Sequence, residues 1–170
     1  MNFNTMNMQE KEVLEIVEVL GKTLPKLPDG RIDYSNSDIA PVITVFVKHG
    51  DEILILKRSD KVRTYKGKWN TVAGYLDEVK PIEYKVLEEL REETGVEGNV
   101  ISKIKFGRPY KFVDNKIKKT WIVFPVLVEL KEKIDPKLDW EHTEFRWIKK
   151  EELANFDTVP NLDKSFEKVC

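Results

Sequence analysis

Residues 74–96, with the sequence GYLDEVKPIEYKVLEELREETGV, are the most informative stretch of the chain. A helix is predicted over residues 81–94, because Pro81 stands where proline is favoured in a first turn and Gly95 stands where helices end. At about 100° per residue, one face of this helix is apolar. That face consists of Ile82, Val86 and Leu90. The stretch therefore predicts a helix that packs one side on a core.

The glutamates of this helix lie beside its apolar stripe instead of opposite it. Glu89 and Glu93, four residues apart, line up along the helix, and Glu92 lies within roughly 60° to 80° of them. Like charges at this spacing destabilise an isolated helix by a few tenths of a kcal/mol per pair, and a divalent cation would turn the repulsion into coordination. A solvated acidic face is the alternative. We favour a cation site because the cluster borders the core stripe, a strand ending in Gly74 precedes it, and a second acidic group follows at residues 141–144.

Length and composition bound the class of protein. The 170 residues suit one domain, and a content of 41% hydrophobic and 35% charged residues argues against a disordered chain. A formal net charge of -1 gives no sign of a general nucleic-acid binder, so no nucleic-acid duplex is expected as a partner. The apolar runs fall far short of the roughly 18 residues of a membrane helix, and residues 1–10 lack the pattern of a signal peptide. We therefore expect a cytoplasmic location and no membrane contact.

Few residues of the chain could bind a metal through sulfur or nitrogen. The only cysteine, Cys170, is the last residue, and the only histidines are His49 and His142. This excludes a cysteine-rich zinc site and nearly excludes a site built from several histidines. Any metal must be held by carboxylates, which favours Mg²⁺ or Mn²⁺.

The chain divides into two parts, residues 1–38 and residues 39–170. Apolar residues recur with helical spacing over residues 9–20, and Gly21 stands where a C-terminal cap belongs. Prolines and a glycine in residues 23–37 predict an extended connection. The N-terminal helix either packs on the domain or makes a dimer contact, which leaves open a homodimer through this helix or through an edge strand.

Residues 39–170 are predicted to alternate strands with helices. A tight hairpin is predicted for residues 42–47 and 53–58, and a short strand over residues 69–74 precedes the acidic helix. Further strands are predicted over residues 100–106, 108–113, 120–129 and 144–148, followed by two short helices. Pro125 suggests an edge strand or a bulge. Strands on both sides of a central helix indicate a mixed α/β domain, not a helix bundle or a pure sandwich.

The stretch 74–96 resembles the signature of the Nudix hydrolases. That signature reads glycine, five residues, glutamate, seven residues, arginine, glutamate, an aliphatic, any residue, two glutamates, any residue, glycine and an aliphatic. The matching positions here are Gly74, Lys80, Glu88, Glu89, Leu90, Arg91, Glu92, Glu93, Thr94, Gly95 and Val96. Flanking segments LKRS, KWNTVAG and EHTEFRW agree, so the resemblance covers about residues 40–155. It implies a Nudix-like α/β/α sandwich around a mixed β-sheet, with an extra N-terminal helix.

Two positions depart from the signature: Lys80 replaces the first glutamate and Glu88 replaces the arginine. In the family these positions carry opposite charges, and the arginine helps to orient the metal-binding carboxylates. We interpret the two changes as one salt bridge with its polarity swapped. An exposed pair of this kind contributes about 0 to 1 kcal/mol, so it would orient more than it stabilises, and it requires a separation within roughly 4 Å.

The resemblance implies metal-dependent hydrolysis of a nucleoside diphosphate linked to another group, with a small-molecule nucleotide as substrate. The metal ligands that it implies are Glu89, Glu92, Glu93, the carbonyl oxygen of Ala73, and Glu141. One of the three helix glutamates also acts as the base. Glu144 is the second choice for the downstream acid.

The predicted substrate-binding residues are Arg58, Trp69 and Glu144. Arg58 and its neighbour Lys57 suit a phosphate contact, with solvated charge at a strand end as the alternative. A nucleobase could stack on one of four aromatic residues, although a place in the core is the more common role of each. These are Trp69, Tyr110, Phe112 and Trp121. His142 either reaches a phosphate or is a histidine satisfied within the core.

Two other functions share this fold. A non-catalytic Nudix-like domain could bind a nucleotide as a sensor or interaction module, and the departures at Lys80 and Glu88 are the evidence for it. Because the core acids remain, we favour a pyrophosphatase. An enzyme similar to isopentenyl diphosphate isomerase needs an internal cysteine, and Cys170 is terminal.

Overall fold

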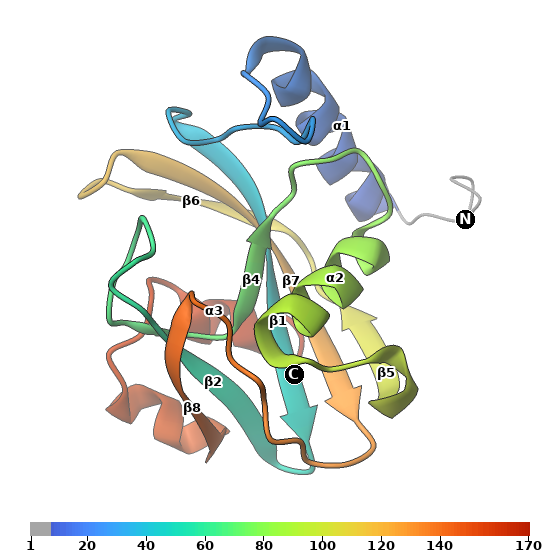
Figure 1. Cartoon of the computed structure of the whole chain (residues 1–170), viewed down its shortest axis with the longest axis vertical. Helices are drawn as coiled ribbons and strands as arrows, with labels where there is room; N and C mark the ends of the chain where they lie inside the picture. Colours follow the sequence, from blue (N-terminus) through green and yellow to red (C-terminus); the bar gives the residue numbers. More distant parts are fainter. Residues whose placement is uncertain (1–7) are drawn as a thin grey trace.

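The computed structural model describes residues 8–170, and within them eight strands form one mixed sheet (Figure 1). The strands are β1 (Ile39–His49), β2 (Glu52–Arg58), β3 (Trp69–Asn70), β4 (Val72–Tyr75), β5 (Ile101–Phe106), β6 (Tyr110–Asp114), β7 (Lys119–Leu130) and β8 (His142–Lys149). The main path through the sheet is β3-β2-β1-β7-β5, while β4 pairs with β1, β6 with β7, and β8 with β2. β1 and β7 are parallel, and the other pairs are antiparallel.

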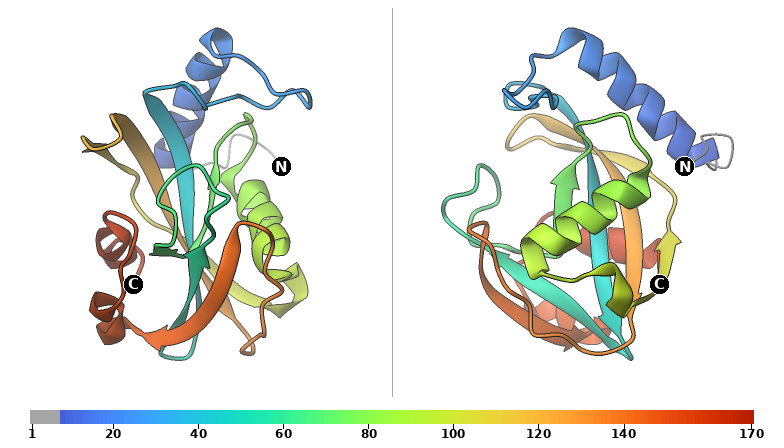
Figure 2. Two further views of the ribbon diagram at one scale, coloured as in Figure 1. Left: turned by 60° about the vertical axis from the view of Figure 1, so that its left-hand side comes forward. Right: turned by 45° about the vertical axis from the view of Figure 1, so that its right-hand side comes forward.

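Helices cover both faces of the sheet, as Figure 2 shows. One face carries α2 (Ile82–Thr94); the other carries the 3₁₀ helix η3 (Lys150–Asn155) and α3 (Leu162–Glu167). Because side chains alternate along a strand, Leu54 and Leu56 of β2 join the core under α2, whereas Ile53 joins the core under α3. The expected α/β/α sandwich is confirmed. No helix within residues 8–170 has the length and hydropathy needed to span a membrane.

The predicted hairpin is present as β1 and β2, but the strand predicted over residues 69–74 is two strands. Thr71 separates them, and its hydroxyl donates a hydrogen bond of 2.6 Å to the carbonyl oxygen of Val45. After this break β3 pairs with β2, whereas β4 pairs with β1. The pairing with β1 holds Ala73 and Gly74, where the signature starts, in the middle of the sheet.

Pro125 lies in the central strand β7, so the expectation of an edge strand or a bulge is wrong. One side of β7 pairs with β1, and its other side pairs first with β6 and then with β5. The β6 ladder stops at Val123 and the β5 ladder starts at Val126, so Pro125 occupies a gap in which its missing N–H is not needed. Its carbonyl still accepts the N–H of Gly107 at 2.8 Å.

The N-terminal helix α1 (Met8–Thr23) packs on the rest of the molecule. It continues past Gly21 and stops just before Pro25, because the proline ring cannot continue the helix; the cap expected at Gly21 is therefore wrong. Val13, Leu14 and Val17 are buried in the same core as α2. A short 3₁₀ turn, η2 (Gly98–Val100), leads from α2 into β5.

A side chain of α1 also caps α2. The N–H of Ile82 donates a hydrogen bond of 2.7 Å to Oε1 of Glu10. The first N–H groups of a helix have no partner within the helix, and Pro81 at the N-cap position offers no side-chain acceptor. A carboxylate at this end also interacts favourably with the helix dipole. The N-terminal helix therefore helps to position the helix that bears the acidic cluster.

Candidate active site

Helix α2 carries most of the predicted site residues and is fixed at its end and along its inner face. Gly95 ends it with a φ of 76°, a left-handed conformation that glycine adopts without steric cost, and its N–H bonds to the carbonyl of Arg91. The apolar stripe is completely buried and consists of Ile82, Val86 and Leu90. Anchored in this way, the helix buries Glu89 and Glu93 against strand β4 instead of exposing them to bulk solvent.

Gly74 and Glu89 approach each other very closely. A Cβ atom built on Gly74 would lie 2.6 Å from Cδ and 2.7 Å from Oε1 of Glu89, distances that real Cβ contacts do not reach. Only a residue without a side chain allows the carboxylate to lie directly on the strand. A larger residue at position 74 would therefore displace the Glu89 carboxylate from the strand.

Glu93 is anchored deeper than Glu89, with 2% of its surface exposed. The N–H of Ala73 donates a hydrogen bond of 3.2 Å to its Oε2, and Nε2 of His142 lies 3.5 Å from its Oε1. The other ring nitrogen of His142, Nδ1, is 3.1 Å from Oδ1 of Asp139. Burial raises the pKa of Glu93 well above its usual range, with repulsion from Glu89 adding to the effect, and burial lowers the pKa of His142. Both groups therefore favour their neutral forms in this arrangement.

Three carboxylates face a cavity of about 450 Å³: Glu89, Glu92 and Glu141. Burial raises the pKa of Glu89 to about 7; Lys85 opposes this change, while Glu92 and Glu141 add to it. Burial also raises the pKa of Glu141, and the carboxylate of Asp139 adds to that shift. The backbone of Ala73 lines the same cavity. Of the five predicted ligands, four thus line one cavity, whereas Glu93 is not among the residues that line it.

The chemistry of these donors fits an oxygen-coordinated divalent cation. Glu92 and Glu141 oppose the ionisation of Glu89, and Gly74 leaves room for the Glu89 carboxylate against the strand. As they stand, no three acidic or histidine side chains among residues 8–170 form a ready coordination group. Coordination would therefore require the carboxylates to draw together.

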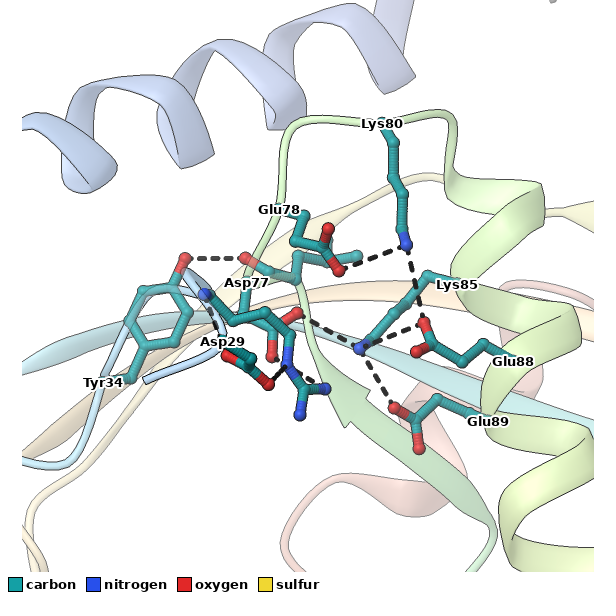
Figure 3. A network of polar contacts seen from close by, with 10 residues as sticks. Asp29, Tyr34, Asp77, Glu78, Lys80, Lys85, Glu88 and Glu89 are labelled. Atoms are coloured by element: carbon teal, nitrogen blue, oxygen red, sulfur yellow. Dashed lines mark hydrogen bonds and ion pairs between the residues drawn. The ribbon is translucent and has the colours of Figure 1, made fainter. Parts of the chain in front are cut away.

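The charged residues around Glu88 form a connected network (Figure 3). Lys80 Nζ lies 3.7 Å from Oε2 of Glu88, within the separation that the swapped pair requires, and 3.1 Å from Oε1 of Glu78. Oε2 of Glu88 accepts no hydrogen bond from the described residues and is held only at ion-pair distance. Its second cation is Lys85, at 3.6 Å.

Lys85 was not anticipated from the sequence. Its residue exposure is 3%, and its ammonium lies 3.1 Å from Asp77 Oδ1 and 3.2 Å from Glu89 Oε1 (Figure 3). Burial lowers the pKa of this amine, but the surrounding carboxylates, Glu89 first, outweigh it and raise the pKa above its ordinary value. The only available hint was the i, i+4 spacing to Glu89 on the inner side of the helix.

The cavity lining also has a basic part and a part made of buried or half-buried aromatic residues. Arg58 lines the cavity, with its Nε donating to the carbonyl oxygen of Thr64 at 2.9 Å. Burial lowers the pKa of Arg58, although Glu141 opposes the shift. The aromatic part consists of Tyr65, Tyr75, Tyr110, Phe112 and Trp121, of which Tyr75 and Trp121 stack with centroids 6.2 Å apart. A guanidinium and several aromatic rings thus line the same cavity as the carboxylates.

Two predicted substrate-binding residues are not brought to this cavity. Trp69 packs edge-on against Phe156 in the core under α3, with ring centroids 5.3 Å apart. Glu144 lies on β8 and pairs with Lys57 at 3.5 Å. Asn70 lines the cavity instead, with an Oδ1 atom that is buried and without a hydrogen-bond partner among the described residues. Asn70 follows Trp69 on strand β3, so the two side chains lie on opposite faces of the sheet.

Comparison with known proteins agrees with this geometry. Residues 37–169 match the family model of the NUDIX domain. The chain is 32% identical over 125 residues to the bis(5'-nucleosyl)-tetraphosphatase (asymmetrical) of Mus musculus, which covers 70% of this chain and 81% of that protein. The structure of a MutT protein from Methanosarcina mazei Go1 has a TM-score of 0.61 at 24% identity, over 78% of this chain and 93% of that one. A C. elegans Ap4A hydrolase binary complex has a TM-score of 0.60 at 15% identity, over 76% and 93%.

The chain therefore belongs to the Nudix family. It is a hydrolase of the pyrophosphatase type, as its fold and its carboxylate cavity had indicated. Hydrolases of this family generally use divalent metal ions.

Proposed function

We propose that this protein hydrolyses a phosphoanhydride bond in a nucleoside diphosphate derivative and that it needs Mg²⁺ or Mn²⁺ to do so. The observation that carries the proposal is the contact of Glu89 with Gly74 at the edge of a cavity that also holds Glu92, Glu141 and Arg58. Such a cavity places carboxylates for a cation beside a guanidinium for a phosphate.

The cation would be held by Glu89, Glu92, Glu141 and the carbonyl oxygen of Ala73. When bound, the ion neutralises charge that develops on the phosphates and makes water a better nucleophile. Glu93 accepts the Ala73 N–H, which fixes the strand that offers the carbonyl. One of the helix glutamates takes the proton of the attacking water.

Substrate binding is assigned to the basic and aromatic parts of the cavity lining. Arg58 contacts a phosphate, and a base stacks on Trp121 or on its neighbours Tyr75 and Phe112. A cavity of about 450 Å³ is in the range of small-molecule sites. The 32% identity to a bis(5'-nucleosyl)-tetraphosphatase makes dinucleoside tetraphosphates the first substrates to test. The cytoplasmic location and the homodimer expected from the sequence stay predictions.

The proposal is tested with a panel of dinucleoside polyphosphates, nucleoside triphosphates and nucleotide sugars, each with Mg²⁺, with Mn²⁺ and with chelator. We expect turnover that stops with chelator. Glu89→Gln should lower kcat/KM by at least about 100-fold, because a neutral amide is a poorer ligand for the cation than a carboxylate. Glu97→Gln, an exposed change just beyond the helix, is the matched control. Nucleotides that raise the melting temperature without any metal-dependent turnover would instead support the binding module.

A further inference from the structure

We infer that Lys85 is a positioning residue that replaces the missing signature arginine, by holding Oε1 of Glu89 so that Oε2 stays turned toward the cation site. The inference rests on the proposed metal-dependent function and assigns a role to a residue outside the signature positions.

The position that carries arginine in the signature is Glu88 in this chain, so the cation must come from elsewhere. Lys85 stands one turn earlier on α2, and its ammonium lies between Glu88, at 3.6 Å, and Glu89, at 3.2 Å. Lys80, in the loop before the helix, places its ammonium 3.7 Å from Glu88. Two lysines thus surround the reversed charge, and only Lys85 also contacts Glu89.

The ammonium of Lys85 is fixed from the side opposite to Glu89. Asp77 accepts its hydrogen bond at 3.1 Å. The carbonyl of Asp77 in turn accepts the N–H of Ile32 at 2.9 Å, and its carboxylate lies 3.8 Å from Arg31. Asp77 on one side and Glu89 on the other thus keep the flexible Lys85 side chain in one position. A charge that stays in one position can orient a neighbouring side chain.

The contact with Lys85 uses one oxygen of Glu89. Among residues 8–170, Oε2 of Glu89 has neither a hydrogen bond nor an ion pair, and Figure 3 shows the other oxygen directed toward Lys85. A lysine acts as a point charge, so it can contact one oxygen of a carboxylate without covering the other. Lys85 can therefore orient Glu89 and still leave one oxygen for a metal ion.

A buried lysine beside a metal ligand has a second conceivable effect, because its charge could compete with the ion for Glu89. Competition and positioning predict opposite changes when the ammonium is removed. If Lys85 positions Glu89, then Lys85→Met weakens Mn²⁺ binding; if Lys85 competes, the same variant tightens it.

The experiment measures the Kd of Mn²⁺ by titration calorimetry and by the loss of free-ion EPR signal, beside melting temperature and turnover. We expect Lys85→Met to raise the Kd at least 10-fold. The control is Lys133→Met, which removes a lysine paired with Glu52 away from the cavity and should leave the Kd unchanged. An unchanged or lower Kd in Lys85→Met overturns the inference.

A rescue variant separates positioning from a general loss of stability. Lys80→Glu, Lys85→Met and Glu88→Arg together restore the charge pattern of the signature and provide an arginine for Glu89. We expect this triple variant to bind Mn²⁺ within about threefold of the unmodified protein. A folded triple variant that binds as weakly as Lys85→Met overturns the inference. If Lys85→Met does not fold, Asp77→Asn is measured instead; it loosens the ammonium without altering Glu89 and should raise the Kd severalfold.

The outcomes also separate this inference from the proposed function. A protein that binds Mn²⁺ and loses that binding in Lys85→Met, but cleaves no nucleotide, supports the role of Lys85 and overturns the function. A protein that cleaves nucleotides with an unchanged Kd in Lys85→Met overturns the role of Lys85 alone. An unmodified protein that binds no Mn²⁺ overturns both.

Discussion

Gly74 and Glu89 make the contact on which the site depends, and it can be tested with the smallest change available. Gly74→Ala places a methyl group less than 3 Å from the carboxylate of Glu89, so the carboxylate must move off the strand. We expect overpacking to destabilise the fold by about 1–3 kcal/mol and to weaken Mn²⁺ binding at least 10-fold. Melting curves and Mn²⁺ titration check both effects. Gly98→Ala, where a Cβ meets nothing within 4 Å, should change neither; equal effects at the two glycines would contradict the explanation.

The raised pKa of Glu89 predicts how the metal-free protein responds to pH. An ordinary glutamate titrates near 4.5, whereas folding raises this pKa to about 7. Between these two values the folded state holds a proton that the unfolded chain has lost, so stability must fall as pH rises through this window. We expect the free energy of unfolding to fall by on the order of 2 kcal/mol between pH 5 and pH 8. In the presence of chelator, this fall appears as a decrease in the urea midpoint.

Two comparisons isolate the contribution of Glu89 to that decline. Glu89→Gln cannot titrate at this position and should make the decline less steep, leaving the part that Glu93 and Glu141 contribute through their own raised pKa values. Added Mn²⁺ should also reduce the decline, because the ion favours the ionised carboxylates. An equally steep decline in Glu89→Gln would assign the effect to other groups.

At the residue scale, the sequence anticipated the acids and missed their counter-ion. Glu89 and Glu93 could be named because the spacing of the signature is local, and Glu141 could be named only because the family resemblance implies an acid downstream. Lys85 has the same local spacing to Glu89, yet its importance comes from burial, with 3% of its surface exposed. Whether a lysine on a helix faces water or carboxylates depends on what packs over it.

Helix α2 receives its N-terminal cap from helix α1, so the contribution of this contact to stability can be tested. Glu10→Ala removes the acceptor of the Ile82 N–H and should cost about 0.5–2 kcal/mol, as loss of a cap usually does. For a chain of this size the melting temperature should then fall by about 2–4 °C per kcal/mol. Glu18→Ala, at an exposed position of the same helix, is the control in thermal melts. A fall of the same size in both would show that the cap contributes nothing.

The strands show what the periodicity of a sequence can and cannot predict about a structural element. The hairpin of β1 and β2 has two runs of apolar, largely β-branched residues joined by a glycine turn, so its position was predicted correctly. The break at Thr71 and the central position of Pro125 were not, because they depend on which strands lie alongside. Thr71 donates a hydrogen bond to Val45, 26 residues away. Pro125 lies where the pairing partner of β7 changes from β6 to β5.

At the scale of the whole molecule, we propose that the N-terminal helix unfolds together with the Nudix domain. Leu14 of α1 is buried in the same core as residues of α2 and of the sheet. Leu14→Ala should therefore destabilise the protein by about 2–5 kcal/mol. Fluorescence-detected urea unfolding can measure this, since all four tryptophans lie in residues 69–147, outside α1.

The expected result is a single transition that moves to lower urea as a whole. The control is Val19→Ala, which truncates a residue that is 62% exposed and should leave the midpoint almost unchanged. If α1 unfolded by itself, the tryptophan transition of Leu14→Ala would match that of the unmodified protein, and the two-part division of the chain would hold energetically as well.

The sequence by itself determined the family signature, the helix that bears it with its glutamates, and most of the strands. These features depend on spacing within one or two turns or on alternation within one strand, so neighbouring residues suffice to define them. Tertiary structure alone decided that Lys85 faces Glu89 from the core, that Glu10 caps a helix 72 residues further along the chain, and that Trp69 turns away from the cavity. Each of these outcomes depends on which segments the folded chain brings into contact, because burial and long-range pairing set the direction and the charge environment of a side chain.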